Sequence, residues 1–266
     1  MNDSYKIALR AAIAGSREIS KIYQEDFETI IKEDGSPLTK ADLASSSAIH
    51  NLLDPLGIPL TGEESTHLPY EIRKLWKESW CIDPLDGTKE FIRRNDEFAV
   101  NIAHIIEGNA VFGIIASPVQ ERILFGGKKE GVFISSFDSI ENPTKWQSIQ
   151  SEENIGSTLK LIGSRSHGTG PLNDLLETLE PSFKDITFAS KGSSLKFFDL
   201  ALGDAHIYPR FAPTMEWDIA AGQAIIEALG GEVLDYHQKT PLVYNKENLL
   251  NPYFVVRSKA LLMAME

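Results

Sequence analysis

The spacing of apolar residues predicts two helices at the start of the chain. Over residues 1–23 the apolar side chains recur every three or four positions, and polar residues separate them. This period places them on one face of an amphipathic helix that packs on a core. Gly35 and Pro37 then mark a turn, after which the pattern predicts a second helix over 40–53.

Short apolar runs further along the chain predict strands. The runs at 58–62 and 79–83 are too short for a helix, and acidic residues stand at their ends. Between 98 and 136 several apolar runs alternate with turn residues and show no helical period, which predicts an antiparallel meander. The first half of the chain is therefore expected to be an α+β unit.

The second half alternates between strand and helix patterns. A polar, aperiodic stretch at 138–158 indicates a segment that runs over the surface near a boundary between two lobes. Strands are then expected at 159–164, 185–190, 206–211 and, closing the chain, 253–258, with helices at 171–179, 194–202 and 217–229. This α/β alternation predicts a largely parallel or mixed sheet covered by helices. We expect one domain, with an α+β lobe over about 1–145 and an α/β lobe over about 146–266.

Composition and charge exclude several classes of protein function. The 266 residues are 42% apolar and 24% charged, as in ordinary globular proteins, and the net charge of −12 repels nucleic-acid polymers and anionic membranes. The single cysteine, Cys81, excludes an internal disulfide and a zinc site with two thiolates, so a reducing cytoplasm fits. No window holds the roughly 18 apolar residues of a membrane span, so no integral membrane segment is expected.

The segment Asp83-Pro84-Leu85-Asp86-Gly87-Thr88 carries the clearest chemical signal. Its two aspartates are expected to lie in a tight turn at the end of a strand and to point into one small volume. They repel each other unless a cation lies between them, and carboxylate oxygens favour hard Mg²⁺ or Mn²⁺. Backbone N–H groups at Gly87 and Thr88 can receive a phosphate oxygen. Taken alone, the aspartates would fit simple capping of the turn equally well.

Further acids stand in matching places. Glu63 and Glu64 end a predicted strand, and Asp218 begins a strongly apolar helix. In isolation, Asp218 would serve as an N-terminal cap, and Asp42 as a first-turn acid that interacts with the helix dipole. The recurrence of carboxylates at the ends of elements favours a shared metal site.

These acids follow the order and approximate spacing of a known family. The sequence resembles the lithium-sensitive, magnesium-dependent phosphatases of the inositol monophosphatase superfamily at Asp42, Glu63-Glu64, Asp83 to Thr88 and Trp217-Asp218. Within it, the chain is most similar to the 3'(2'),5'-bisphosphate nucleotidases of the CysQ type, through DPLDGTKEFIRRNDEFAVNIA, GSRSH, GSSLKF and YPRFAPTMEWDIAAGQAI. The resemblance implies a layered αβαβα sandwich of the inositol monophosphatase and fructose-1,6-bisphosphatase type.

The resemblance also implies roles for the acids. Two ligand sets are implied: Glu63, Asp83 and the carbonyl of Leu85 for a first Mg²⁺, and Asp83, Asp86 and Asp218 for a second. The site would take two or three Mg²⁺ ions, with Mn²⁺ as a substitute and Li⁺ as an inhibitor. Such ions bind the phosphate, lower the pKa of the attacking water and stabilise the leaving oxygen. Thr88 and Asp42 would orient and deprotonate that water, and Glu64 would support them without touching metal.

Several other residues are candidates for binding the substrate. A bisphosphorylated nucleotide carries a second phosphate that the metal ions do not neutralise, so cations must bind it. The candidates for the phosphate and ribose pocket are Ser164, His167, Lys196 and Arg210, and those for the reacting phosphate are Glu63, Leu85, Asp86, Gly87, Thr88 and Asp218. Each basic candidate would by itself also fit a solvated surface position, and the pair Arg93-Arg94 fits an exposed basic turn better than a contact with substrate. Glu216 would either bind a sugar hydroxyl or fill the first turn of its helix.

The residues alone indicate a metal-assisted phosphate-ester hydrolase. The resemblance implies hydrolysis of the 3'-phosphate of adenosine 3',5'-bisphosphate to AMP and phosphate, with 3'-phosphoadenylyl sulfate as a second substrate. Two alternatives stay open: the same chemistry on an inositol phosphate or fructose 1,6-bisphosphate, and an inactive metal and nucleotide sensor. The expected partner is a small phosphorylated nucleotide in the cytoplasm. Peripheral attachment to the inner face of the cell membrane and the oligomeric state stay open.

Overall fold

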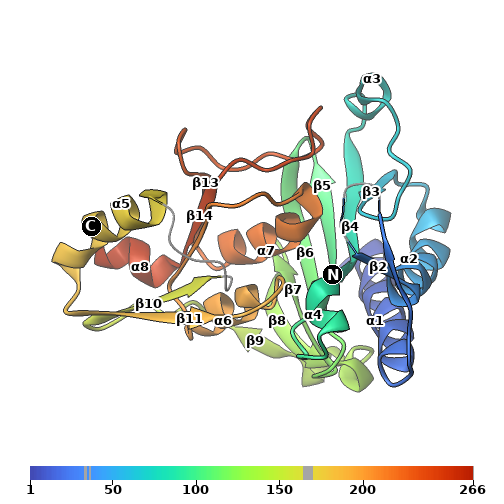
Figure 1. Cartoon of the computed structure of the whole chain (residues 1–266), viewed down its shortest axis with the longest axis horizontal. Coiled ribbons are helices and arrows are strands. Elements are labelled where there is room, and N and C mark those ends of the chain that lie inside the picture. Colours follow the sequence, from blue (N-terminus) through green and yellow to red (C-terminus); the bar gives the residue numbers. More distant parts are fainter. Residues whose placement is uncertain (33–34, 36, 164–169, 266) are drawn as a thin grey trace.

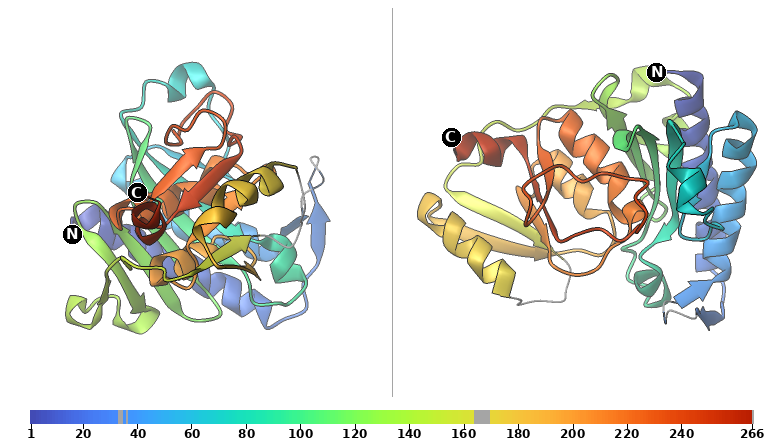
Figure 2. Two further views of the ribbon diagram at one scale, coloured as in Figure 1. Left: turned by 90° about the vertical axis from the view of Figure 1, so that its left-hand side faces the viewer. Right: turned by 90° about the horizontal axis from the view of Figure 1, so that it is seen from above.

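Five layers of helices and sheets stack along the long axis of the molecule (Figure 1). The computed structural model describes residues 1–32, 35, 37–163 and 170–265. The layers are α1 (Asp3–Tyr23) with α2 (Lys40–Leu53), a seven-stranded sheet, α6 (Lys196–Leu202) with α7 (Glu216–Ala228), a five-stranded sheet, and α5 (Gly170–Leu179) with α8 (Lys259–Ala264). Figure 2 shows the same succession from two further sides. The predicted αβαβα sandwich is confirmed.

The outer helices α1 and α2 cover one face of the larger sheet. The buried face of α1 carries a row of alanine, leucine and isoleucine side chains. The two helices approach so closely that a Cβ atom on Gly15 would lie 2.6 Å from Ser45 Oγ. Both helices lie where the apolar period predicted them. The segment between them, predicted as a turn, also forms a short hairpin of β1 (Thr29–Ile31) and β2 (Pro37–Thr39).

The larger sheet has the strand order β3-β4-β5-β6-β7-β8-β9. Its strands are β3 (Leu60–Gly62), β4 (Glu78–Asp86), β5 (Ala99–Ile106), β6 (Asn109–Ser117), β7 (Arg122–Gly127), β8 (Gly131–Ser136) and β9 (Gln147–Ile149). Between them lie η1 (Asp54–Leu56), α3 (Tyr70–Arg73), α4 (Thr88–Ile92), η2 (Phe137–Ser139) and η3 (Pro143–Lys145). β5 to β8 form the predicted antiparallel meander. β9 was not predicted, because three residues within a polar stretch are too few to show a period.

The smaller sheet has the strand order β11-β10-β12-β14-β13. Its strands are β10 (Thr158–Gly163), β11 (Asp185–Ser190), β12 (Ile207–Arg210), β13 (Glu232–Asp235) and β14 (Phe254–Arg257), with the turn η4 (Glu180–Ser182) before β11. β10 pairs parallel with β11 and β12, while β14 is antiparallel to β12 and β13, so the sheet is mixed, as expected. The prediction that a strand closes the chain is wrong, because α8 follows β14. This helix has six residues, too few for a clear helical period.

Helices α6 and α7 fill the space between the sheets and join them in one hydrophobic core. Its members include Cys81, Ala103 and Ile115 of the larger sheet, Phe197 and Ile225 of the helices, and Tyr208 and Phe254 of the smaller sheet. A Cβ atom on Gly113 of β6 would lie 2.0 Å from the carbonyl oxygen of Ala221, so α7 lies directly on the larger sheet. This packing fixes where α7 begins, and Asp218 is near its start.

Substitution of Gly222 tests whether the fit between α6 and α7 stabilises the fold. A Cβ atom on Gly222 would lie 2.3 Å from ring atoms of Phe197, which is completely buried. We expect Gly222→Ala to lower the free energy of unfolding by about 1–3 kcal/mol, because overpacking forces the ring or the helix to move. Urea unfolding measures this change. The control is Gly170→Ala, since no atom of the described residues, apart from its chain neighbours and the backbone of its own helix, lies within 4 Å of a Cβ there. Equal stability of the two variants would contradict the close fit.

Candidate active site

Strand β4 presents two acids, Asp83 and Asp86, in one volume because it contains a bulge. Residues three apart in a regular strand point to opposite faces of the sheet. Asp83 pairs with Asn101 and Asp86 with Ala99, so β4 uses one more residue than β5 over this interval. The extra residue shifts the alternation and brings both carboxylates to the same side. We predicted a tight turn here, but the strand continues to Asp86, and the left-handed residue Gly87 (φ 93°) ends it.

Asp218, in the first turn of α7, completes a cluster with these two aspartates. One possible ligand oxygen from each of the three lies within 4.8 Å of the others. One oxygen of each aspartate accepts hydrogen bonds, with Leu85 N–H donating to Asp83 (3.0 Å), Met215 N–H to Asp218 (2.8 Å), and Asn101 Nδ2 (3.3 Å) and Ser194 N–H to Asp86. Asp218 therefore does cap its helix. The remaining oxygen of each carboxylate accepts no hydrogen bond from the described residues, so it can face a cation.

Burial and mutual repulsion raise the pKa values in this cluster. Asp83 is 1% exposed, and burial, followed by the charges of Glu63 and Asp86, raises its pKa well above the usual range. Burial, followed by the charge of Asp86, raises the pKa of Asp218 to about 8. A divalent cation would remove the repulsion, and a donor set made only of carboxylate oxygens suits a hard ion such as Mg²⁺. The residues present therefore fit a metal site.

Glu63 faces the same cavity, but a lysine also engages it. Glu63 follows β3 and lines, with the three aspartates, a cavity of about 200 Å³. Lys32 Nζ donates to Glu63 Oε1 at 2.9 Å and to Glu64 Oε1 at 2.5 Å. Burial raises the pKa of Glu63, and Lys32 opposes this rise. Any cation at Glu63 must therefore share that carboxylate with Lys32, a contact that no sequence pattern indicated.

The structure also brings Asp42 and Thr88 together. Thr88 Oγ1 lies 2.9 Å from Asp42 Oδ1, to which it donates, and 3.2 Å from the carbonyl oxygen of Leu85. Asp42 Oδ2 accepts hydrogen bonds from the N–H and the hydroxyl of Thr39, each at 2.7 Å, and so caps α2. Burial is the main cause that raises the pKa of Asp42. One oxygen of Asp42 thus fixes the side chain, and the other holds the Thr88 hydroxyl.

A larger cavity of about 410 Å³ lies beside the acids and is lined with cations. It shares Asp86, Gly87, Lys89, Glu90 and Asp218 with the smaller cavity. Its basic residues are Lys89, Arg93, Lys191, Lys196 and Arg210. In a chain of net charge −12, five basic residues around one cavity indicate an anionic ligand.

Lys196 is the most buried of these cations, at 4% exposed. Its Nζ donates to the carbonyl oxygens of Lys191 and Ser193, the first at 3.1 Å, and lies 5.1 Å from the centre of the Tyr208 ring. Burial lowers the pKa of Lys196 to about 8. Since both carbonyls and the ring face stabilise a cation, the site keeps a charged amine at neutral pH.

Three other residues, Ser164, His167 and Glu216, were also considered from the sequence as contacts of the substrate. Ser164 and His167 lie outside the described residues. Glu216 is 1% exposed and accepts hydrogen bonds from Asn245 N–H (2.6 Å) and from the N–H (3.0 Å) and Nζ (2.6 Å) of Lys246. These contacts engage both its oxygens, which favours a structural role for Glu216 over binding of a sugar hydroxyl.

Asn101 of β5 is a site residue to which we assigned no role from the sequence. It is 1% exposed, and its Nδ2 donates to Asp86 while its Oδ1 accepts from the Ser194 hydroxyl at 2.6 Å. It therefore ties the larger sheet to the segment that enters α6. A signal was present, because Asn101 interrupts the apolar run FAVNIAHII, and buried polar groups need partners.

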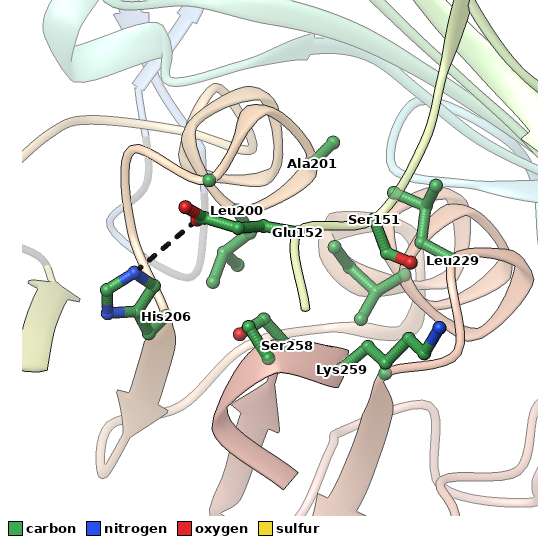
Figure 3. A pocket seen from close by; sticks show the side chains of 12 residues that line it. Ser151, Glu152, Leu200, Ala201, His206, Leu229, Ser258 and Lys259 are labelled. Carbon is green, nitrogen blue, oxygen red and sulfur yellow. Dashed lines mark ion pairs between the residues drawn. The ribbon is translucent and has the colours of Figure 1, made fainter. Parts of the chain in front are cut away.

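A small cavity lies between α6, α7 and the start of α8 (Figure 3). Its volume is about 20 Å³, enough for one water molecule but not for a nucleotide. His206 Nδ1 accepts from the N–H of Lys160 at 3.1 Å, and its Nε2 lies 3.9 Å from Glu152 Oε2. This cavity is therefore not the substrate site.

Fold and site together define an αβαβα sandwich with a carboxylate metal site. Residues 1–263 match the model of the inositol monophosphatase family, and the chain belongs to that family.

Several bacterial proteins are similar to this chain over most of its length. The 3'(2'),5'-bisphosphate nucleotidase CysQ of Salmonella typhimurium is 39% identical over 227 residues, 85% of this chain and 87% of that protein. CysQ of Escherichia coli K12 is 37% identical over 243 residues, 90% of this chain and 93% of that protein. The crystal structure of CysQ from Bacteroides thetaiotaomicron superposes with a TM-score of 0.83 at 37% identity, and covers 95% of this chain and 96% of that one.

The raised carboxyl pKa values predict a pH-dependent effect of divalent metal on stability. The pKa of Asp218 rises from the ordinary value of 3.8 to about 8 in the folded protein. Between these two pH values, and without metal, the folded protein therefore binds more protons than the unfolded chain. Stability in a chelator should therefore fall as pH rises through this window. Saturating Mg²⁺ should offset this loss, so the difference in melting temperature between Mg²⁺ and chelator should grow from about pH 5.5 to about pH 8.

The control for this prediction is Asp26→Asn, at an exposed acid distant in sequence from the cluster acids. It should leave the pH dependence unchanged, whereas Asp83→Asn should flatten it by removing one of the repelling charges. If the difference in melting temperature between Mg²⁺ and chelator did not depend on pH in the unsubstituted protein, the buried, metal-binding cluster would be contradicted.

Proposed function

We propose that the protein is a 3'(2'),5'-bisphosphate nucleotidase, which hydrolyses the 3'-phosphate of adenosine 3',5'-bisphosphate to give AMP and phosphate. We include 3'-phosphoadenylyl sulfate as a second substrate. The observation that carries the proposal is the cluster of Asp83, Asp86 and Asp218 beside a cavity lined with basic residues. The cluster suits a metal-assisted phosphate reaction, and the basic cavity suits a second anionic group. Identity of 37–39% with the CysQ relatives over most of both lengths supports the choice of substrate.

The proposed metal ligands divide into two sets. They are Glu63, Asp83 and the Leu85 carbonyl for one Mg²⁺, and Asp83, Asp86 and Asp218 for another. Bound divalent ions would neutralise phosphate oxygens, lower the pKa of a water and stabilise the leaving oxygen. We propose Mg²⁺ as the working ion, in two or three copies, with Mn²⁺ as a substitute and Li⁺ as an inhibitor. The free carboxylate oxygens of the three aspartates support the second set.

The Thr88 hydroxyl is the proposed route for the proton of the attacking water. Its hydrogen points to Asp42 Oδ1, which leaves the lone pairs of Thr88 Oγ1 able to accept a hydrogen bond from a water. Asp42 is held by Thr39 and has a raised pKa, so it accepts a proton more readily than an exposed carboxylate. As the proton of Thr88 moves to Asp42, Thr88 takes the proton of the water.

Glu64 is proposed to support this pair by position and charge. Its charge adds to the causes that raise the pKa of Asp42. Its contact with Lys32 also connects it to Glu63, because the ammonium group lies between the two carboxylates. Glu64 therefore affects both the proton acceptor and a proposed metal ligand without entering the ligand sets.

The rest of the nucleotide is proposed to lie in the larger cavity. Lys196 and Arg210 line it, and Lys196 places a buried positive charge at its wall, although its Nζ also donates to two carbonyl oxygens. Ser164 and His167 stay proposed contacts of the phosphate and ribose. The reacting phosphate would lie against the proposed metal ligands and the backbone of Gly87 and Thr88.

We propose that the chain works as one phosphatase domain with two lobes, about 1–145 and about 146–266. The core that α6 and α7 share with both sheets supports this view.

No helix in the described parts of the chain is long and apolar enough to cross a membrane. We propose a cytoplasmic location, in which the buried Cys81 stays reduced; burial, together with nearby acids, raises the pKa of its thiol well above the usual range.

A substrate panel tests the proposed reaction. With Mg²⁺ present, we expect kcat/KM for adenosine 3',5'-bisphosphate to exceed that for inositol 1-phosphate and fructose 1,6-bisphosphate by at least about a hundredfold, because the cation-lined cavity stabilises the second phosphate of the nucleotide. Phosphate release measures each rate. A preference for inositol 1-phosphate would reject the nucleotide assignment. Binding of nucleotide without release of phosphate would identify a sensor.

Asp83→Asn tests the bridging ligand. The substitution keeps the size of a side chain that is 1% exposed but removes the charge proposed to bridge two ions. We expect kcat to fall by at least about a hundredfold, with the far-ultraviolet circular dichroism spectrum unchanged. Asp26→Asn should retain full activity. An active Asp83→Asn variant with unchanged Mg²⁺ dependence would refute the bridging role.

A further inference from the structure

The side chains of Lys89 and Arg93 line the larger cavity without a protein partner. The other cations of this cavity are engaged: Lys191 Nζ lies 2.6 and 2.7 Å from the carboxylate oxygens of Asp199, and Lys196 donates to two carbonyl oxygens. Arg210 also has partners within the protein. Among the described residues, the side chains of Lys89 and Arg93 have no hydrogen bond, ion pair or ring contact. They are therefore available to a ligand.

Lys89 and Arg93 lie one helical turn apart along α4. The N–H of Arg93 donates to the carbonyl oxygen of Lys89 at 3.1 Å, so the two residues have the i, i+4 relation that places side chains on one helix face. Two like charges in this relation repel each other, which is unfavourable in an unliganded helix. A dianion between them would replace that repulsion with two attractions.

The two residues differ in their distance from the acids. Lys89 lines both the larger cavity and the smaller cavity of the carboxylate cluster, whereas Arg93 lines the larger cavity alone. An anionic group that contacts both therefore lies to one side of the cluster, not on it. A guanidinium group can hold two phosphate oxygens at once, and an ammonium group adds a point charge.

An exposed lysine and arginine are ordinarily solvated and bind nothing. Three observations distinguish this pair. Both line a concave surface, both lack partners among the described residues although the chain is strongly acidic, and both belong to α4 or its C-cap, just after the segment that carries Asp86. The neighbouring Arg94 provides a contrast, because it donates to the carbonyl oxygens of Tyr23 and Glu25 and fixes the end of α1.

We propose that Lys89 and Arg93 bind the second anionic group of the substrate, the 5'-phosphate that is not hydrolysed. This inference rests on the proposed function and adds the residues that discriminate a bisphosphorylated nucleotide from a monophosphorylated one. The same pair would hold the 5'-phosphate of AMP after the 3'-phosphate has been released.

The first test compares two substrates. For Lys89→Met and Arg93→Met, we expect KM for adenosine 3',5'-bisphosphate to rise by about tenfold, with kcat changed less than about twofold. For Arg93→Met, whose side chain lines the larger cavity alone, the kcat/KM for adenosine 3'-monophosphate should change by less than about twofold, since that substrate lacks the 5'-phosphate. For Lys89→Met, the loss with adenosine 3'-monophosphate should be smaller than the loss with adenosine 3',5'-bisphosphate. The matched control is Lys129→Met, which removes one charge from an exposed lysine at the β7–β8 hairpin tip and should leave both substrates unaffected.

The second test measures binding without turnover. In the presence of Mg²⁺, isothermal titration calorimetry should show that each of the two substitutions weakens the binding of AMP by about tenfold and leaves the affinity for adenosine unchanged. Equal losses for AMP and adenosine, equal losses for the two substrates, or no loss at all would overturn the proposal. These outcomes differ from failure of the proposed function, in which the unsubstituted protein itself would release no phosphate from adenosine 3',5'-bisphosphate.

Discussion

The repulsion between buried carboxylates is the constraint on which the site depends. Asp83, Asp86 and Asp218 come from the end of a strand and the start of a helix that are far apart in sequence, yet their oxygens meet within 4.8 Å. Burial removes the water that would screen their charges, so their proximity is unfavourable until a proton or a cation is present. The rest of the fold holds them together against this repulsion, and a divalent cation makes the arrangement favourable.

The packing of α7 supplies much of that restraint. Small residues let the helix lie directly on the larger sheet, at Gly113 and Ala221, and on α6, at Gly222. The start of α7 is thereby fixed relative to β4. Hydrogen bonds complete the restraint, since each aspartate has one oxygen held by N–H donors. The other oxygen of each carboxylate accepts no hydrogen bond from the described residues and stays available to a cation.

Charges of opposite sign surround this acidic centre in two ways. Lys32 lies between Glu63 and Glu64 and partly neutralises the side of the site nearest β3. On the other side, α4 and the segment before α6 bring basic residues to the larger cavity. The site therefore has an acidic part suited to metal and a basic part suited to a phosphate that no metal neutralises. This division would let a strongly acidic chain bind the proposed nucleotide, which carries two phosphate groups.

The sequence by itself determined the elements whose signals are local. The apolar period predicted α1, the meander from β5 to β8 followed from short apolar runs, and the close spacing of Asp83 and Asp86 indicated a metal site. The tertiary structure decided what depends on distant contacts. The bulge in β4 arises from pairing with β5. Lys32, directly after β1, meets Glu63, directly after β3, and Glu216 finds its partners at Asn245 and Lys246. Periodicity reports which face of an element is buried, but only packing decides which side chains meet there.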